Sequence, residues 1–588
     1  MELRKFLLVC ALGLAATHCG AEAEDPGALG DDQDVTGAAA GDDEEDGAGA
    51  AQKNQDNVPG SLVITSPERA AFIKQTSAPL EIKGTGATPA LTINGEPANV
   101  APDGSFTATL RPEPGLNLIL ASDGDARLEQ AFLYGKFESL TTPVPQGVAV
   151  SMNAAGVGAK SPSTSLTTVI NEALRGRDLI AGVRGQSMSG SSGPFNWSYR
   201  VTNARYASVA VSLGARSGGV NATAVVNDVS VTGTITVKAP LGISYSRSVT
   251  LRAGKTTLAG PVALAVDKAS GGMKVSMSNP STKLEGFRFD SNNAGLPCCV
   301  DSLMTNFLRP RVEKALRDGV RQHLPKALEV SLEGLGLPKT LDLSKAGVPK
   351  PVPIKTRFDG GEFQSNGMSI SASVLFGGAF AKDEPGAAAP GWLRLGKTFT
   401  PKRTRPIGAS FAVDAVNQLF LTAWGTGAFE RAPVDAAPLA AIKVDAGLPP
   451  ILDVTDDGAV SVTLAEIGIE AMAAGERIRT AITVGQAVTP SAQGQTLVFT
   501  PKGEPTIAIT WLEAPEVIDP AIRDAIAPVA KGLVTAFLKP VKLPFPRFSL
   551  NAAGGGLAGK SLVITTPKVA VDPAAARLGV EGGLRLER

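Results

Sequence analysis

The sequence predicts a β-dominated α+β fold, in which an N-terminal β-sandwich precedes two similar halves that each add a long amphipathic helix to antiparallel strands. Composition is the first observation: 65 Gly and 42 Pro residues with only 5% aromatics suit many strands joined by turns. The second is the alternation of apolar residues with Thr and Ser, clearest at 229–237. The third is that a helical apolar stripe, a Leu-Pro turn and a strand follow one another twice, at 299–343 and 517–550.

The first nineteen residues predict export. Arg4 and Lys5 precede an apolar run from 6 to 16 that is too short to span a bilayer, which is typical of a secretory signal peptide. The residues ahead of Cys19 resemble a bacterial lipoprotein signal, although His18 stands where Gly, Ala or Ser is usual. This resemblance implies that Cys19 is acylated; cleavage by an ordinary signal peptidase is the alternative. We expect a cell-envelope protein, an outer-membrane lipoprotein facing the periplasm or the cell surface.

Residues 20–58 are predicted to form a disordered tether. They hold twelve Asp or Glu residues against one Lys, a net charge of −11, and they lack aromatic residues and any periodic apolar pattern. Such a segment cannot bury enough apolar surface to fold, and it would hold a folded body away from a membrane. No later stretch has eighteen consecutive apolar residues, so the sequence predicts no membrane span in the body.

Residues 59–136 are predicted to form the small sandwich. Short alternating strands are separated by Asn-Gly, Asp-Gly and Pro-Gly turn signals at regular spacing. The segment also resembles the immunoglobulin-like modules of exported bacterial proteins. That resemblance implies a spacer or an adhesive domain.

The first half is predicted to span 140–350. A short helix with Leu166 and Ile170 on one face opens it, and alternating strands follow. A long helix then carries an apolar stripe that steps by four residues through Leu316, Val320 and Leu324.

The second half is predicted to span 351–588 and to repeat this order. An amphipathic segment at 409–429 contains Phe411 and Phe420, with Gly425 placed to end the helix. The closing helix has Asp519 as its cap and Pro520 in its first turn. Its apolar stripe includes Ile522, Ile526, Leu533 and Phe537.

At these helices the chain resembles the tubular lipid-binding (TULIP) superfamily, which includes the bactericidal/permeability-increasing protein and lipid-transfer proteins of plasma. Segments 306–328 and 522–550 resemble its long helices, and 409–429 is similar to the helix that opens its second domain. The resemblance covers about 140–588 and implies two tubular halves, each a twisted antiparallel sheet wrapped around a long amphipathic helix, with acyl chains in the tunnel between. Animal members carry a disulfide between widely spaced cysteines, whereas Cys298 and Cys299 are adjacent here and form either a vicinal disulfide or two buried thiols.

The apolar stripes supply the candidate lipid-binding residues. For each of them ordinary core packing is the alternative, because a helix on a sheet needs the same stripe. The candidates are Leu166, Ile170, Leu316, Val320, Leu324, Phe411, Phe420, Ile522, Ile526, Leu533 and Phe537.

The sequence disfavours an enzyme. His323 is the single histidine outside the leader, so a Ser-His-Asp triad would have to use it. No metal-ligand spacing, phosphate-binding Gly loop or nucleic-acid surface is present, and no cofactor is predicted. We therefore expect a lipid-binding protein whose partners are the acyl chains of a phospholipid or glycolipid and, through the lipid anchor, a membrane. The alternative is a cell-surface adhesion or scaffold protein with filled interiors.

Overall fold

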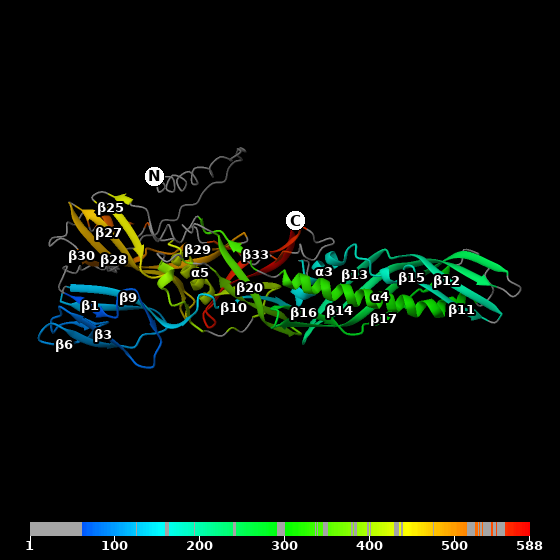
Figure 1. Cartoon of the computed structure of the whole chain (residues 1–588), viewed down its shortest axis with the longest axis horizontal. Helices are drawn as coiled ribbons and strands as arrows, with labels where there is room; N and C mark the ends of the chain where they lie inside the picture. The colour runs from blue at the N-terminus through cyan, green and yellow to red at the C-terminus, as the bar shows by residue number, and fades with distance from the viewer. Residues whose placement is uncertain are drawn as a thin grey trace, which may run out of the picture.

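The computed structural model describes residues 62–587 apart from internal gaps, the longest of which are 291–299, 345–350, 428–433 and most of 514–558. The predicted signal peptide, Cys19, the tether, the adjacent cysteines, Leu533 and Phe537 lie outside the described residues. The described chain is mostly β and elongated, with the sandwich and the second half at one end and the first half at the other (Figure 1).

The N-terminal unit consists of two sheets around one core. Ile82 and Phe106 of one sheet and Phe132 of the other are each at most 2% exposed and belong to the same apolar cluster. One sheet has the order β1 (Val63–Ser66), β3 (Leu80–Thr85), β7 (Phe106–Leu110), β6 (Asn99–Val100). The other has the order β2 (Ala71–Lys74), β9 (Ala126–Glu138), β8 (Gly115–Asp123), β4 (Thr92–Ile93), β5 (Glu96–Pro97).

The first half is built on a long antiparallel hairpin. Its strands pair from Gly219 with Ala263 to Lys238 with Ser244, and the predicted alternation at 229–237 is confirmed, since the valines and Ile235 are buried between partly exposed Thr and Ser. The sheet has the order β11 (Ser187–Ser192), β12 (Phe195–Arg205), β14 (Gly219–Lys238), β15 (Ser244–Asp267), β16 (Gly272–Met277). Attached to it are β13 (Ser208–Arg216), β17 (Ser281–Glu285) and β18 (Arg288–Asp290), and its helices are α2 (Ala154–Val157), α3 (Leu166–Leu174), η1 (Ala181–Val183) and α4 (Val300–Glu333).

The second half has its own antiparallel sheet and, among the described residues, one long helix. The sheet has the order β24 (Val434–Ala436), β25 (Leu439–Ala446), β27 (Val460–Ala473), β28 (Glu476–Gln493), β29 (Thr496–Pro501), β31 (Lys542–Pro544). Strand β26 (Ile451–Val454) pairs with β27 and β30 (Thr506–Glu513) pairs with β28. The helix is α5 (Val413–Gly425), which ends at the predicted Gly425.

A further sheet joins the two halves. This sheet was not predicted from the sequence. Its order is β19 (Thr340–Leu341), β20 (Val352–Gln364), β21 (Gly367–Phe376), β10 (Val144–Asn153), β23 (Ile407–Ala412), β34 (Arg577–Glu587), β33 (Ser561–Asp572), β32 (Phe548–Ser549). We call it the central sheet. Strands from distant parts of the sequence therefore meet side by side: Val148 of β10 pairs with Phe411 of β23, and Ile407 of β23 pairs with Gly582 of β34.

The fold prediction is wrong about the helices: no described half is a sheet wrapped around a long amphipathic helix. Helix α4 lies along one side of the first sheet, and Lys314, Asp318 and Arg321 on its outer face are exposed. Helix α5 is 13 residues long and nearly all of them are buried. Several curled sheets enclose most of the core instead, and the apolar period of a helix does not reveal whether a sheet surrounds it or only underlies it.

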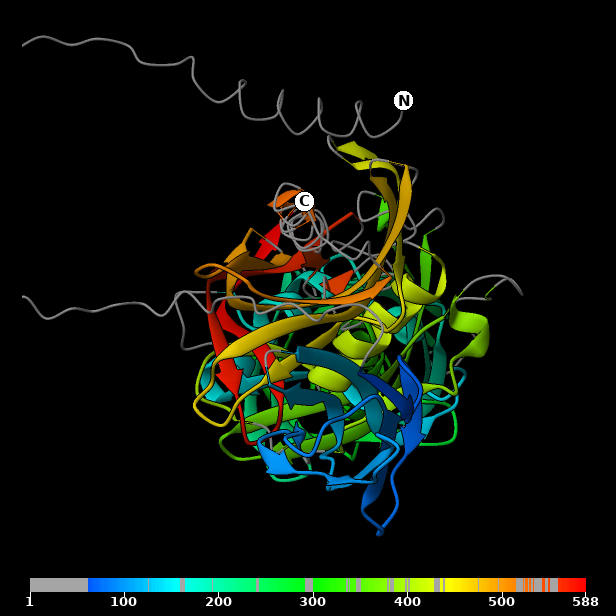
Figure 2. The same cartoon turned by 90° about the vertical axis from the view of Figure 1, so that its left-hand side faces the viewer.

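The sandwich is fixed to the second half by strand pairing and by a buried ion pair. Strand β22 (Trp392–Arg394) extends the sandwich sheet by pairing with β9. Arg69 Nη1 lies 2.6 Å from Glu466 Oε2, and the other oxygen of Glu466 accepts the Ala131 N–H at 2.5 Å. The end-on view shows the sandwich lying against the strands of the second half (Figure 2).

A second carboxyl group is buried in this interface. The backbone of Glu129 exchanges hydrogen bonds with Thr510 Oγ1 at 3.0 and 3.1 Å, which brings its side chain in beside Glu466 and Arg69. Glu129 Oε1 is buried without a hydrogen-bond partner in the described part of the chain. Burial raises the pKa of Glu129, and the Glu466 carboxylate raises it further, while Thr483 and Arg69 oppose the shift.

We predict that replacing Glu129 by Gln stabilises the protein at alkaline pH. A carboxyl group whose pKa is raised on folding contributes its stability below the unfolded pKa and loses it as the pH rises through the folded pKa. Glu129→Gln should therefore melt about 2–4 °C above the parent at pH 8, the shift of roughly 1 kcal/mol in a domain of this size, and the difference should shrink toward pH 5. Thermal unfolding at the two pH values measures this. The exposed Glu96→Gln is the control, and an equal shift in both variants would contradict the prediction.

Candidate functional site

A continuous apolar interior runs through both halves. One cluster of buried side chains extends from Val144 in the central sheet, through α3, α4 and the first sheet, to α5 and the second sheet. It forms because the strands place every second residue inward and the helices every third or fourth. This interior is the largest feature shared by the two halves.

The inner face of α4 is the most regular part of that interior. Leu308, Val312, Leu316, Val320 and Leu324 follow one another at intervals of four, and each is at most 2% exposed. This spacing places the five side chains on one face of the helix, against β15–β18 and α3.

Polar ties hold the shorter helix α3 to the sheet. Asn171 Oδ1 accepts the Val211 N–H at 2.6 Å, and its Nδ2 donates to the Val211 carbonyl at 2.9 Å. Thr167 Oγ1 donates to the Val157 carbonyl at 3.0 Å. Leu166 and Ile170 are thereby fixed in the interior, at 2% and 0% exposure.

Helix α4 has a different kind of attachment. Three ion pairs, Arg309 with Glu313, Lys314 with Asp318 and Lys326 with Glu329, join residues of the helix to one another. Its side-chain hydrogen bond to the sheet, from Arg317 to Thr282 Oγ1, is long at 3.4 Å. Contact between α4 and the sheet is therefore mainly apolar and non-directional.

A cleft of about 430 Å³ opens beside α4, between this helix and residues 178–186. We call it the α4 cleft. Its rim carries both signs of charge, from Arg311, Lys314 and Asp318 on α4 and from Asp178 on the opposite wall. The rim acids are already engaged, Asp318 by Lys314 and Asp178 by Arg184, so the rim is polar without a strong net charge.

His323 also lines the α4 cleft. Burial lowers its pKa, and the neighbouring Arg177 cation lowers it further, while Asp178 opposes the shift. The lowered pKa favours the neutral form of the imidazole. In the described residues, no three His, Cys, Asp or Glu side chains come together in a way that would hold a metal ion.

A glycine sets the distance between α4 and the cleft wall. A Cβ atom at Gly319 would lie 2.0 Å from the Leu179 carbonyl oxygen, so only glycine allows the helix to approach this closely. Gly319 was not among the residues predicted from the sequence. A glycine in the middle of a helical stripe was the available signal, because it costs stability unless something packs against it.

Nine of the eleven candidate lipid-binding residues lie in the apolar interior. Phe411 reaches it from strand β23 instead of the predicted helix, and Phe420 reaches it from α5. None of the nine lines the α4 cleft or the other hollow described below. They are Leu166, Ile170, Leu316, Val320, Leu324, Phe411, Phe420, Ile522 and Ile526, none more than 6% exposed. Their contact with lipid stays a prediction.

In the described part of the chain no helix has both the length and the apolar character needed to cross a membrane. No family model matches the chain, and no curated protein matches it.

Some solved structures are distantly similar to the chain. A lipopolysaccharide binding protein is similar over 76% of this chain and 100% of its own, with 13% identity and a TM-score of 0.41. P47 of Clostridium botulinum E1 is similar over the same shares, with 7% identity and a TM-score of 0.26. A DUF4784 family protein from Bacteroides caccae is similar over 39% of this chain and 84% of its own, with 8% identity and a TM-score of 0.11. Similarities this distant do not establish the family or the function of the chain.

We predict that Gly319→Ala pushes α4 away from the cleft wall. The added Cβ meets a backbone oxygen, which cannot move aside as a flexible side chain would, and overpacking of this kind costs about 1–3 kcal/mol. The gain in helix propensity, about 1 kcal/mol, offsets only part of that cost. Denaturant unfolding should therefore show a net loss of stability. Gly254→Ala is the matched control, because a Cβ there meets nothing within 4 Å, and equal stability of the two variants would contradict the close contact.

Proposed function

We propose that this protein is an exported, lipid-anchored protein that binds a phospholipid or glycolipid and holds its acyl chains in the apolar interior, for transport or sensing at the cell envelope. The observation that carries the proposal is the apolar, non-directional contact of α4 with the first sheet, beside an open cleft. Acyl chains can replace helix–sheet contacts of this kind without leaving buried polar groups unpaired.

The energy of such binding comes from burial. Each CH₂ group removed from water contributes about 0.8 kcal/mol, so a single long acyl chain can offset the cost of displacing α4 from the sheet. Entry beside α4 would leave α3 in place, because Asn171 and Thr167 hold α3 to the backbone on either side of it. The polar rim of the α4 cleft would meet the lipid headgroup at the surface.

Lipid content tests the proposal directly. We expect mass spectrometry of an organic extract of the purified full chain to find bound phospholipid or glycolipid, and a fluorescent fatty acid to bind saturably. Val320→Trp fills the interior from α4, so it should reduce uptake of the probe by about tenfold or more, given the roughly 1–3 kcal/mol cost of overpacking. Arg321→Trp, on the exposed face of the same helix turn, should leave uptake unchanged.

One result would oppose lipid binding, and another would oppose its placement beside α4. A preparation without bound lipid that also takes up no fatty acid would favour the adhesion or scaffold function, with a filled interior. Equal uptake by Val320→Trp and the parent, with circular dichroism showing both folded, would place any bound lipid outside the α4 region.

Membrane attachment is a separate part of the proposal and rests on Cys19. We expect the parent to partition into the detergent phase and to incorporate a labelled fatty acid, and Cys19→Ser to lose both properties. The hydrophobic anchor is the physical reason, because one acyl chain binds a bilayer only weakly and several bind it stably. Cys10→Ser, within the apolar run of the leader, is the control. Detergent partitioning of Cys19→Ser like the parent would overturn the anchor without affecting acyl-chain binding.

A further inference from the structure

Arg577 is a buried cation in the middle of the central sheet. It is 3% exposed and lies at the start of β34, next to β23 and close to β10. Its Nε donates to Ser410 Oγ at 3.0 Å, its Nη2 to the Ser410 carbonyl at 3.1 Å and its Nη1 to the Gln146 carbonyl at 2.7 Å. The ring of Phe399 covers the guanidinium carbon at 4.1 Å.

The charge of Arg577 lacks a direct counter-charge. In the described part of the chain no carboxylate lies within ion-pair distance of its guanidinium, and its hydrogen-bond acceptors there are neutral oxygens. Burial lowers the pKa of Arg577 to about 10, and Asp359, Asp572 and Asp414 only partly oppose the shift. A buried cation is costly unless an anion compensates it.

The nearby carboxylates are committed elsewhere. Asp572 pairs with Lys402 at 3.0 Å. Asp359 accepts the Gln146 N–H at 2.7 Å and the Ser371 hydroxyl at 2.7 Å. Asp414 accepts the backbone N–H groups of Leu395 and Gly396. Arg577 is therefore the unpaired charge of this cluster.

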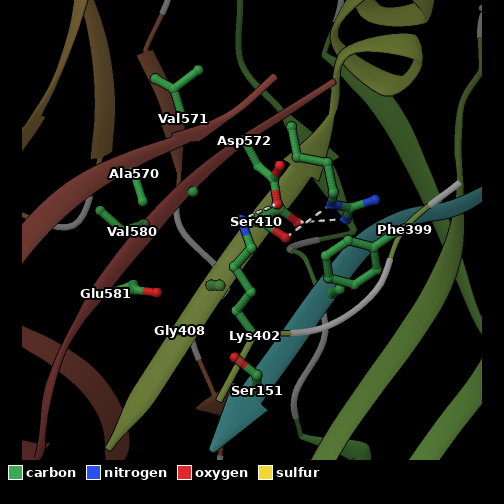
Figure 3. A pocket seen from close by; sticks show the side chains of 14 residues that line it. Ser151, Phe399, Lys402, Gly408, Ser410, Ala570, Val571, Asp572, Val580 and Glu581 are labelled. Carbon is green, nitrogen blue, oxygen red and sulfur yellow. Dashed lines mark hydrogen bonds and ion pairs between the residues drawn. The ribbon is translucent and has the colours of Figure 1, made fainter. Parts of the chain in front are cut away.

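A hollow of about 90 Å³ adjoins Arg577 on the face of the central sheet. Its floor is made of small residues on neighbouring strands, among them Ser151, Gly408, Ser410 and Ala570, and Phe399 and Lys402 reach over it from the segment before β23 (Figure 3). Asp572 and Glu581 also line it, but Asp572 is neutralised by Lys402 at 3.0 Å, and Glu581 accepts the Thr404 hydroxyl at 3.1 Å and faces Arg405 at 3.9 Å.

Donors remain for a ligand in this hollow. A guanidinium has five N–H groups, and three of those of Arg577 have acceptors in the described part of the chain. Oxyanions are the ligands that a guanidinium fork binds best, through two parallel hydrogen bonds. The volume corresponds to roughly three water molecules at about 30 Å³ each, which is enough for one small oxyanion.

We propose that this hollow binds one small oxyanion of the size of a phosphate group, held by Arg577, with the Lys402 ammonium shared between the anion and Asp572. The anion compensates the charge of the buried guanidinium. It also links β34 to the segment before β23 that carries Lys402. The site is separate from the acyl-chain interior and does not depend on lipid binding. The phosphate group comes either from a free ion or from a lipid headgroup.

Calorimetric titration of the full chain with inorganic phosphate, at constant ionic strength, tests the site. A second titration uses dihexanoyl phosphatidic acid, whose short chains keep it in solution. We expect saturable one-to-one binding of at least one probe. Binding of inorganic phosphate identifies a site for the free ion, and binding of the lipid alone identifies a headgroup site.

Two variants locate the binding. Ala570→Leu fills the hollow without touching the contacts of Arg577, so it should weaken binding by about tenfold or more, as expected when a ligand's place is occupied, while leaving the melting temperature in phosphate-free buffer near that of the parent. Arg577→Lys keeps the charge but loses the fork, and should weaken binding similarly. Ala440→Leu, at an exposed position of β25, should change nothing.

Either of two results would overturn the proposed site. No saturable binding of either probe to the parent would mean that water alone occupies the hollow. Binding that Ala570→Leu leaves unchanged would place the anion elsewhere on the chain. If Arg577→Lys does not fold, the Ala570→Leu comparison still decides between these results.

Discussion

Both halves of the molecule depend on the pairing of β10, β23 and β34 in the central sheet. Strand β10 leads into the first half, β23 leads into α5 and the second half, and β34 is the last strand of the chain. Arg577, the first residue of β34, donates to backbone carbonyls of the other two strands, Gln146 in β10 and Ser410 in β23. Burying this charge is costly, but a guanidinium offers more hydrogen-bond donors than any neutral side chain. A buried arginine therefore suits a position where one side chain aligns segments that lie far apart in the sequence. Every sheet and helix beyond this point is placed by that alignment.

The two ends of the molecule are held together by different physics. At one end a buried ion pair and a shared strand fix the sandwich to the second half, and such contacts are directional and tolerate little movement. At the other end α4 rests on its sheet through aliphatic side chains, whose attraction has no preferred direction. Rigidity is therefore concentrated around the sandwich and the central sheet, and any opening of the interior is easiest along α4.

Local features of the fold were predictable from the sequence, and long-range ones were not. The alternation around Val231 and Ile235 and the four-residue steps from Leu316 to Leu324 depend only on neighbouring residues, so the strand and the helix face follow from them. The central sheet joins strands separated by hundreds of residues. The alternation of apolar and polar residues along a strand does not identify the strand with which it pairs. Phe411 shows that a prediction within one segment can also fail. It was expected in a helix but lies in strand β23, because β23 gives way to helix α5 at Val413 without a break in apolar character. Arg577 was equally hidden, because an arginine in a strand is ordinarily exposed.

The position of the sandwich limits how an anchored molecule can meet its membrane. The predicted tether, residues 20–58, precedes the sandwich in the sequence, and α4, which borders the cleft, lies toward the other end of the described chain (Figure 1). A flexible chain of the tether's 39 residues has a root-mean-square span of about 35 Å. Helix α4 alone, with 34 residues, is about 50 Å long. Because the sandwich is fixed to the second half, a hinge motion between these two units cannot move the cleft toward the membrane. At this average span, a chain anchored at Cys19 would hold the cleft away from its own bilayer when upright, and would bring the cleft closest to that bilayer by lying flat along it.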